Sequence, residues 1–364
     1  MKLKPIFLIT TIGSSLALSS ITATAGTFKA FDARSAAMGG TGVASAQIAS
    51  APFYNPAMLS AQREEEDFSF LAGAGVSAQD DDNLLQHLSD FADAVNASNT
   101  TLANSEAAAA GAAKPASIQV NSYFSGGWAN KKWTMAVASS GSIKADVNFN
   151  DAGINSTLDL NGLQTKETAF SVARSFGDFA VGITPKLIKL DAYSIAVNAS
   201  SNSSIANIVD SLTNSNVASG SLFTFDAGIV YSLTDNIKVG ATMQNLIEKS
   251  YSGGGRTFNI NSSTRAGIAY TGDIITLAAD YDLTKSDPAI SGGDPTQFMA
   301  LGAEIDLLDS LQLRAGYNKN MAVSGSAPTT TVGLGFNLLA MQLDLTAIKN
   351  NQNTSVFLQL GVRW

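Results

Sequence analysis

The sequence predicts an all-β protein, a transmembrane antiparallel β-barrel of about fourteen strands. Three observations predict this fold. Apolar and polar residues alternate with a period of two along most of the chain, only 14% of the 364 residues are charged, and short connections alternate with long ones. A soluble β-sandwich also alternates, but it normally carries many charges on its exposed face. The low charged fraction therefore favours a barrel whose apolar face contacts lipid.

Composition also narrows the class of function. The chain has 22 Lys plus Arg against 30 Asp plus Glu, a net charge of -8, which argues against a nucleic-acid partner. Without cysteine it has no disulfide, no thiolate metal site and no lipidated N-terminal cysteine. A single histidine, His87, leaves little room for a zinc site or a catalytic triad, and we interpret it as a solvated loop residue. We expect no enzyme activity, cofactor or metal.

Residues 1–25 have the pattern of a secretory signal peptide. Lys2 and Lys4 precede the mostly apolar stretch Ile6–Leu18, and Ala23–Ala25 provides a small-x-small cleavage motif before Gly26. An uncleaved anchor is the alternative, but the stretch is shorter than a spanning helix requires. After Gly26 no apolar run is long enough to cross a bilayer as a helix, so any membrane crossing must use strands.

The strands are predicted from alternation bounded by turn residues. In the clearest hairpin, residues 223–233 alternate, Asp235 and Asn236 form a turn, and residues 237–243 alternate again. The apolar side chains share one parity, and the intervening ones are polar, as at Glu304, Arg314 and Asp344. Comparable segments lie at 68–76, 118–128, 133–137, 170–172, 179–187, 266–270, 275–283, 299–307, 311–317, 332–338, 341–347 and 356–364.

The connections between these segments alternate in length. Every second connection is short, and those between them are usually longer, as in outer-membrane barrels, where short turns lie on one side and long loops on the other. The short connections lie near Asn130, Gly177, Asp235, Gly272, Asp309 and Leu339.

Two long connections are predicted to contain helices. Residues 79–115 carry Leu84, Leu85, Leu88 and Phe91 at helical spacing, and a second insert is predicted at 199–220. If both lie outside the cell, they could shelter an apolar ligand at the barrel mouth, with the four named side chains as contacts. Flexible surface inserts are the alternative. The glycine run at 253–255 is interpreted as a flexible loop.

The segment between the leader and the first strand carries a family resemblance. It contains Ala-Arg, Met-Gly-Gly-Thr-Gly-Val-Ala and Asn-Pro-Ala, within residues 32–59. This signature resembles that of the FadL superfamily of outer-membrane transport barrels. The acidic run 64–67 and the helical first loop make the chain most similar to the branch of TraF-type plasmid (conjugal) transfer proteins. The resemblance implies a plug inside the lumen at 26–66, followed by a barrel at 67–364.

The resemblance also implies that the signature residues hold or gate the plug. Glycines in this run permit positive φ and close approach of the backbone. A nucleotide-binding glycine loop is the rival interpretation, but no P-loop lysine follows. The arginine could pair with acidic lumen residues, although a solvated periplasmic charge is the simpler interpretation. The implied plug or gating residues are Arg34, Met38, Gly39, Gly40, Gly42, Asn55, Pro56 and Ala57.

Two functions follow from the resemblance. The first is passive transport of a hydrophobic or amphipathic small molecule, gated by movement of the plug. The alternative is a docking platform for a conjugation or secretion complex. Both place the protein in the outer membrane of a Gram-negative bacterium after leader cleavage, in contact with outer-membrane lipid and with the barrel assembly machinery.

The C-terminal strand resembles an assembly signal. Leu360, Val362 and the terminal Trp364 share the apolar parity, and an aromatic terminus resembles the signal that assembly machinery recognises. We predict that deleting Trp364 lowers the amount of assembled barrel, measured as heat-modifiable protein in outer membranes. An unchanged amount would contradict this assignment.

Overall fold

A computed structural model describes most of the chain. The signal peptide predicted at 1–25, Trp364 and part of the second predicted insert lie outside the described residues. Those residues are 32–61, 68–80, 82–113, 116–129, 133–201, 210–211, 216–253, 256–288, 294–307, 310–349 and 353–363.

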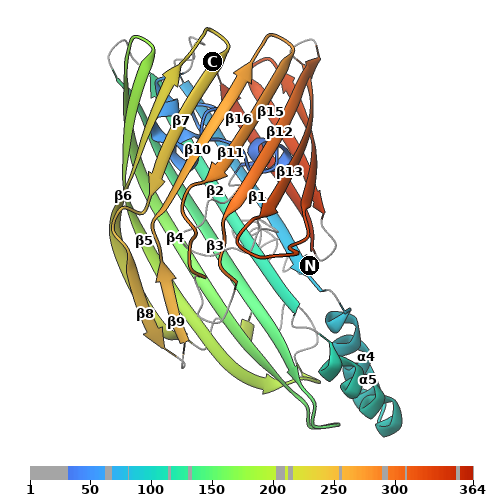
Figure 1. Ribbon diagram of the computed structural model, residues 1–364. Helices are drawn as coiled ribbons and strands as arrows, with labels where there is room; N and C mark the ends of the chain where they lie inside the picture. The colour runs from blue at the N-terminus through green and yellow to red at the C-terminus, as the bar shows by residue number, and fades with distance from the viewer. Residues whose placement is uncertain are drawn as a thin grey trace, which may run out of the picture.

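The predicted barrel is confirmed. Fourteen antiparallel strands form one closed sheet, and the first strand pairs with the last, from Ser69 opposite Arg363 to Gln79 opposite Asn353 (Figure 1). The barrel strands are β1 (Phe68–Gln79), β2 (Ala116–Ala129), β3 (Thr134–Asn150), β4 (Thr157–Phe176), β5 (Phe179–Asn198), β6 (Asn216–Ser232), β7 (Ile237–Gln244), β10 (Ser263–Thr271), β11 (Ile275–Asp282), β12 (Phe298–Leu307), β13 (Leu311–Asn320), β14 (Thr329–Leu338), β15 (Met341–Lys349) and β16 (Asn353–Arg363).

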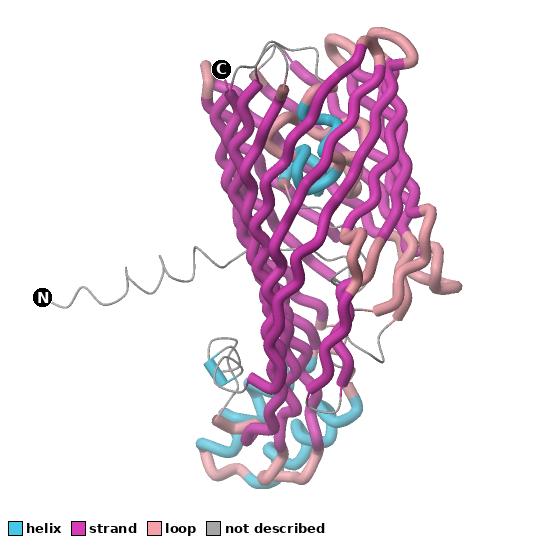
Figure 2. Tube along the Cα trace, turned by 90° about the vertical axis from the view of Figure 1, so that its left-hand side faces the viewer, coloured by secondary structure: helices cyan, strands magenta, loops and turns pink. Residues whose placement is uncertain are grey.

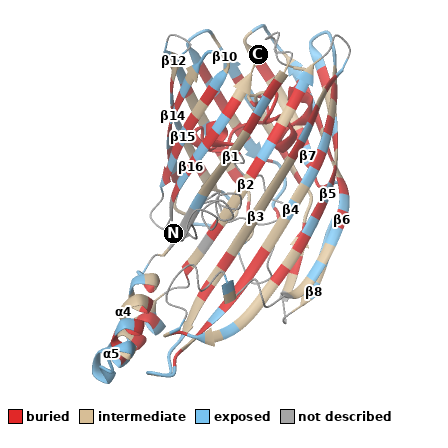
Figure 3. Ribbon diagram, turned by 180° about the vertical axis from the view of Figure 1, so that it is seen from behind, coloured by how far each residue is buried: buried red, intermediate tan, exposed pale blue. Residues whose placement is uncertain are grey.

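Side chains alternate between two environments along each strand. On β15, Leu345 is exposed on the outside, whereas Asp344 and Thr346 are buried in the lumen. Figure 3 shows the same alternation of buried and exposed residues on other strands. A continuous belt of exposed large apolar residues would be unfavourable in water. Because closure pairs every strand, the backbone can lie in lipid, and the belt then faces hydrocarbon.

Aromatic residues collect at the end of the barrel that carries the short turns. Trp128 and Trp133 flank the β2–β3 turn, and Phe176 and Phe179 flank the β4–β5 turn. The Arg174 guanidinium lies 5.2 Å from the Trp133 ring centre and 4.9 Å from that of Phe176. Aromatic girdles mark the membrane interface in barrels of this kind.

One side of the barrel wall is much taller than the other. β4 and β5 have 20 residues each, whereas β7 and β11 have 8. A tilted strand needs only about 9–11 residues to cross a bilayer, so β3 to β6 extend beyond the membrane on the side opposite the short turns. The sequence predictions of β3 (133–137), β4 (170–172) and β5 (179–187) were all too short, because the alternation was followed only along the lipid-facing stripe. On β4, for example, residues 157–168 are largely polar and lack that stripe.

The extension is covered on both faces. Helices α4 (Leu84–Asn96) and α5 (Thr100–Ala112) pack Leu88 and Phe91 on its outer face, against Val147 and Leu160. The hairpin β8 (Lys249–Gly253) and β9 (Arg256–Ile260) packs Phe258 on its inner face. The apolar side chains of the extension are therefore buried on both faces, by α4 and α5 outside and by the β8–β9 hairpin inside.

Three predicted loop assignments change in detail. The helical pair lies against the wall rather than across the barrel mouth (Figure 1). β6 already begins at Asn216, which shortens the insert predicted at 199–220. Gly253, of the predicted flexible loop at 253–255, is the last residue of β8, and residues 254–255 lie outside the described residues. In the described residues, no helix combines the length and apolar character needed to cross a bilayer.

The N-terminal segment lies inside the barrel. It contains α2 (Ala33–Ala37), α3 (Ala51–Tyr54) and the 3₁₀ helix η1 (Pro56–Leu59), and Figure 2 shows these short helices enclosed by strands. Nearly all of residues 32–59 are buried. We call residues 32–61 the plug from here on.

We predict that the lipid-facing belt tolerates charge only near its ends. Leu345→Arg, in the middle of β15, is expected to destabilise the barrel by about 2–4 kcal/mol, against about 0–1 kcal/mol for Met341→Arg at the strand end. Unfolding by guanidinium in lipid vesicles measures both. Equal costs for the two variants would argue against a membrane-spanning β15.

Candidate functional site: the plug and the lumen wall

The short helices of the plug are fixed by local capping. The Asp32 side chain accepts a hydrogen bond from the Ser35 amide at 3.2 Å and so caps α2. After α2 the chain turns at Gly39 and Gly40, with φ of 72° and 88°. A Cβ at Gly39 would lie 2.6 Å from the carbonyl oxygen of Leu301, so both the conformation and the space require glycine there.

The Asn55-Pro56-Ala57 motif forms the other end of the plug. The Asn55 side chain accepts from the Ala57 amide at 3.0 Å, and Pro56 begins η1, where no amide donor is needed. The Asn55 amide nitrogen donates to the carbonyl oxygens of Val43 at 2.8 Å and Ile229 at 3.1 Å. Asn55 thus joins both halves of the plug to β6.

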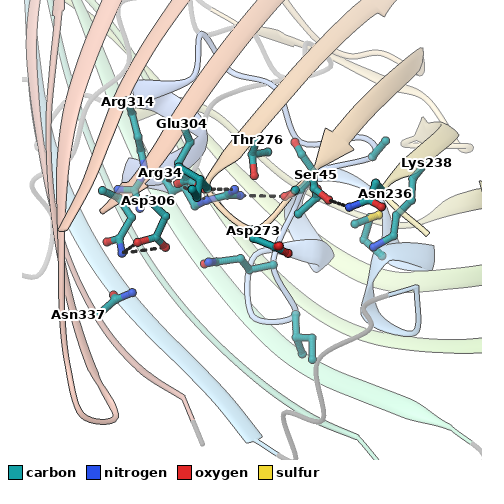
Figure 4. Close-up of a pocket in the computed structure, with 18 of the residues that line it drawn as sticks. Arg34, Ser45, Asn236, Lys238, Asp273, Thr276, Glu304, Asp306, Arg314 and Asn337 are labelled. Atoms are coloured by element: carbon teal, nitrogen blue, oxygen red, sulfur yellow. Dashed lines mark hydrogen bonds and ion pairs between the residues drawn. The ribbon is translucent and has the colours of Figure 1, made fainter. Parts of the chain in front are cut away.

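Arg34 is the charged link between the plug and the wall. Its Nε and Nη2 donate to the two carboxylate oxygens of Glu304 on β12 at 2.8 and 2.7 Å, and its Nη1 donates to the carbonyl oxygen of Ser45 at 2.9 Å (Figure 4). The simpler interpretation, a solvated periplasmic charge, was therefore wrong. Arg34 is buried, and its acidic partner is 270 residues away in the sequence.

Glu304 is shared by two arginines. Arg314 on β13 donates to it at 2.6 Å and also binds Asp344 on β15, which accepts from Gln342 and Gln359 at 2.8 Å each. Burial by itself would lower the pKa of Arg34, but attraction and hydrogen bonding by Glu304 raise it above its ordinary value. Arg34 therefore stays charged, and the network holds the plug by charge-assisted hydrogen bonds.

Lumen side chains also hold the plug backbone. Thr346 and Thr331 donate to the carbonyl oxygens of Ala33 and Ala37 at 2.6 Å each, and the Asp280 carboxylate accepts from the amides of Gly42 and Val43. An unpaired buried backbone group is costly, so these bonds specify one position for the plug. All of the wall residues belong to β11, β14 and β15.

The opposite part of the plug is held mainly by apolar contact, and the Asn55 hydrogen bond to Ile229 is its polar link there. Phe53, Met58 and Leu59 pack on the inner faces of β3 to β6, and the Phe53 ring meets that of Tyr123 edge-on at 6.1 Å. The wall is lined there by small side chains, so the chain of the plug can lie close to it. These wall residues are Ala136, Ala138, Ala169, Ala173, Ala180 and Val230.

Strand glycines allow the closest approaches. Gly182 of β5 pairs with Gly228 of β6. A Cβ at Gly182 would lie 2.4 Å from the backbone of Pro56, and a Cβ at Gly228 would lie 1.8 Å from Asn55 Oδ1. The sequence analysis missed these residues. A glycine inside an alternating strand marks close backbone approach, and that signal could have identified them.

A second buried ion pair was also missed. Lys186 on β5 lies 2.8 Å from Asp226 and 3.5 Å from Glu167, facing the lumen. The alternation along β5 predicts that Lys186 faces the lumen. Its two partners, however, come from the neighbouring strands β6 and β4, and the sequence does not reveal the register of these strands.

A polar cavity of 480 Å³ lies between the plug and the short turns. Arg34, Glu304 and Arg314 line its inner end, and Asp273 and Lys238 lie nearer the turns (Figure 4). On this side the plug presents Ser45, Gln47, Ile48 and Met58 to the cavity.

Other predicted site residues lie elsewhere. Leu84, Leu88 and Phe91 are 0% exposed and pack within the protein, and Leu85 is partly buried, so none of the four lines an open ligand pocket in this conformation. Leu360 and Val362 face outward on β16. Met38 is buried against Ala44, Ala269 and Ala278.

His87 lies on a helix rather than in a loop. It is on α4, and its Nδ1 lies 2.8 Å from a carboxylate oxygen of Glu106 on α5, so it is not simply solvated. Among the described residues, no group of three or more His, Asp or Glu side chains is placed to hold a metal ion.

Comparisons with solved structures identify the fold. The chain is similar to the Ralstonia pickettii toluene transporter TbuX, with a TM-score of 0.61, 13% identity, and coverage of 92% of this chain and 98% of that one. It is similar to the Pseudomonas putida toluene transporter TodX, with a TM-score of 0.57, 13% identity, and coverage of 94% and 98%. A Pseudomonas aeruginosa FadL homologue gives a TM-score of 0.50 and 10% identity, with coverage of 96% and 98%.

Comparisons of sequence identify the family. No curated protein matches the chain significantly in sequence. The model of the family described as "F plasmid transfer operon, TraF, protein" matches residues 52–282, which run from the plug to the end of β11. The chain therefore belongs to this TraF family and has the fold of the FadL-type outer-membrane barrels, as its plug signature indicated.

Proposed function

We propose that the protein is a passive outer-membrane channel for a hydrophobic or amphipathic small molecule. The observation that carries this proposal is the division of the lumen into two halves. The plug is clamped by ions and hydrogen bonds to β11–β16, but it rests on small apolar side chains of β3–β6.

The free-energy cost of moving the plug away from the wall differs between the two halves of the lumen. Moving the plug away from Glu304 and Arg314 would leave buried charges unpaired, at several kcal/mol. Moving it away from Ala138 or Ala173 breaks no ion pair and exposes mainly apolar surface, which an apolar molecule can cover equally well; the Asn55 hydrogen bond to Ile229 is the polar contact to β6. A hydrophobic substrate is therefore expected to pass between Phe53 or Met58 and the alanine-lined wall.

The direction of passage follows from the ends of the barrel. We place the short turns in the periplasm and the tall β3–β6 wall outside the cell, as in other outer-membrane barrels. Substrate then enters beside the extended wall and leaves through the polar cavity near Asp273 and Lys238. TbuX and TodX, toluene transporters of similar fold, support this class of substrate.

Docking in a conjugation or secretion complex is the second candidate. The family description, a plasmid transfer operon protein, favours it, as does the helical pair α4–α5, which projects beside the barrel. Loss of plasmid transfer on deleting residues 84–112, with small-molecule flux retained, would support docking. Normal transfer in that deletant would count against it.

We predict that the purified protein gives liposomes a flux of toluene or of a long-chain fatty acid above that of protein-free liposomes. Because the route needs the plug to leave the apolar wall, a plug–wall cross-link should stop it. The positions Ile48 and Gly127 suit a cross-link, since a Cβ at Gly127 would lie 2.7 Å from Ile48 Cγ2. Gly127 lies on β2 directly opposite Ala136, the β3 residue at the edge of the apolar wall.

The cross-linked variant provides its own control. The natural chain has no cysteine, so Ile48→Cys with Gly127→Cys creates the only disulfide. Flux should fall on oxidation and recover on reduction. Equal flux in both states would exclude a route between the plug and this wall, and no flux of either compound would contradict transport of these substrates.

We also predict that Glu304→Gln loosens the plug. The change leaves Arg34 and Arg314 without their shared carboxylate, at a cost of about 3–5 kcal/mol. Ion conductance in planar bilayers is expected to rise. The control Arg174→Gln alters an arginine on the outer face and should leave conductance unchanged; a closed Glu304→Gln channel would show that the ion pairs do not hold the plug.

A further inference from the structure

The outer face of the barrel contains an apolar groove of 760 Å³, which runs from β16, β1 and β2 onto the tall wall. It crosses the neighbouring strands β16, β1, β2, β3, β4 and β5, which face the viewer in Figure 3. Small residues form its floor, and larger apolar side chains stand around it. The floor includes Ala72, Ala74 and Gly141, and the larger side chains include Phe124, Leu187 and Leu358.

Two lysines border this groove. Lys166 on β4 and Lys189 on β5 are directly opposite each other in the register, and both are exposed on the outward parity. Like charges in directly opposed positions destabilise a sheet. Among the described residues, no carboxylate forms an ion pair with either lysine, so the pair has no acidic partner within that part of the chain.

The lysines lie where the lipid-facing stripe ends. On β5 the outward side chains are apolar from Phe179, beside the short turn, to Leu187, and Lys189 is the next outward residue. This stripe has the length of about 9–11 residues that a tilted strand needs to cross a bilayer. The ammonium groups therefore lie at the lipid head-group level, at the end of the barrel opposite the short turns.

We propose that this groove binds outer-leaflet lipopolysaccharide, with a phosphate of its lipid A between Lys166 and Lys189 and an acyl chain along Leu187 and Phe124. A phosphomonoester carries a charge of about -1.5 to -2 at neutral pH, which matches two ammonium groups. A zwitterionic or uncharged lipid leaves the pair without full compensation. The inference rests on the orientation given under the proposed function, and it is independent of transport.

The test is binding of purified lipid A to the detergent-solubilised full chain, followed by native mass spectrometry. The variant Lys166→Gln with Lys189→Gln keeps the side-chain length and removes both charges. It is expected to bind lipid A about tenfold more weakly than the natural chain, a loss on the scale of two charge-assisted contacts. Lys349→Gln is the matched control, because Lys349 is an exposed, outward lysine at the same end of the barrel, on β15.

Two further ligands make the result specific. Dephosphorylated lipid A should bind the natural chain as weakly as lipid A binds the double variant, and phosphatidylglycerol should bind more weakly than lipid A. Equal lipid A binding by the double variant overturns the proposal, as does an equal loss in Lys349→Gln. Equal binding of phosphatidylglycerol overturns the assignment to lipopolysaccharide.

The outcome is separable from the channel function. A chain that binds lipid A at this pair but shows no small-molecule flux would contradict only the transport proposal. A chain that transports toluene but fails the lysine test would contradict only the lipid site.

Discussion

The structure depends on one constraint: a backbone in hydrocarbon must satisfy its own hydrogen bonds. β1 pairs with both β2 and β16, so no strand of the barrel has a free edge within the lipid. Once the sheet is closed, alternation assigns each side chain to lipid or lumen. Leu345 and Leu358 face lipid for this reason, and Asp344 and Gln359, their chain neighbours, face the lumen.

The same alternation creates the chemistry inside the barrel. Polar residues brought together in an enclosed, poorly hydrated lumen need partners, and the plug supplies many of them. Glu304 lies between Arg34 of the plug and Arg314 of the wall, and Thr346 and Thr331 bind carbonyl oxygens of α2. On the other side, small wall residues such as Ala138 leave space for the apolar part of the plug. The plug is thereby held firmly along one side and by weaker, non-directional contacts along the other.

Beyond the membrane, the side chains of the tall wall keep their alternation, but protein inserts cover them instead of lipid and plug. The outward stripe that faces lipid on the part of β4 nearest the short turn is covered by α4 and α5 toward the opposite end of the strand, at Leu158 and Leu160. The inward stripe is covered by Phe258 of β9, which packs beside Leu190 of β5. Lys166 and Lys189 lie between these regions, at the boundary where lipid gives way to protein cover. The strands continue through that boundary without a break in their hydrogen bonding. The side chains on each face therefore set the level at which lipid ends and protein cover begins.

The sequence by itself determined the strands, the short turns and the burial parity, because alternation and turn residues are local properties of the chain. It also determined the plug segment, through a signature confined to residues 32–59. It could not assign a partner to Arg34 or Lys186. It also took too few residues for β3, β4 and β5, whose extensions leave the lipid; on β4, for example, Leu158 and Leu160 contact α4 and α5 instead.

Only the tertiary structure decided these points. Arg34 and Glu304 are 270 positions apart and meet only after the barrel has closed around the plug. Leu84, Leu88 and Phe91 had the spacing of a helix, but that spacing does not say whether a ligand or the outer face of β3 and β4 covers them. Pattern along a chain reports which face a residue lies on, whereas its partner depends on strand register and closure, which involve the whole chain at once.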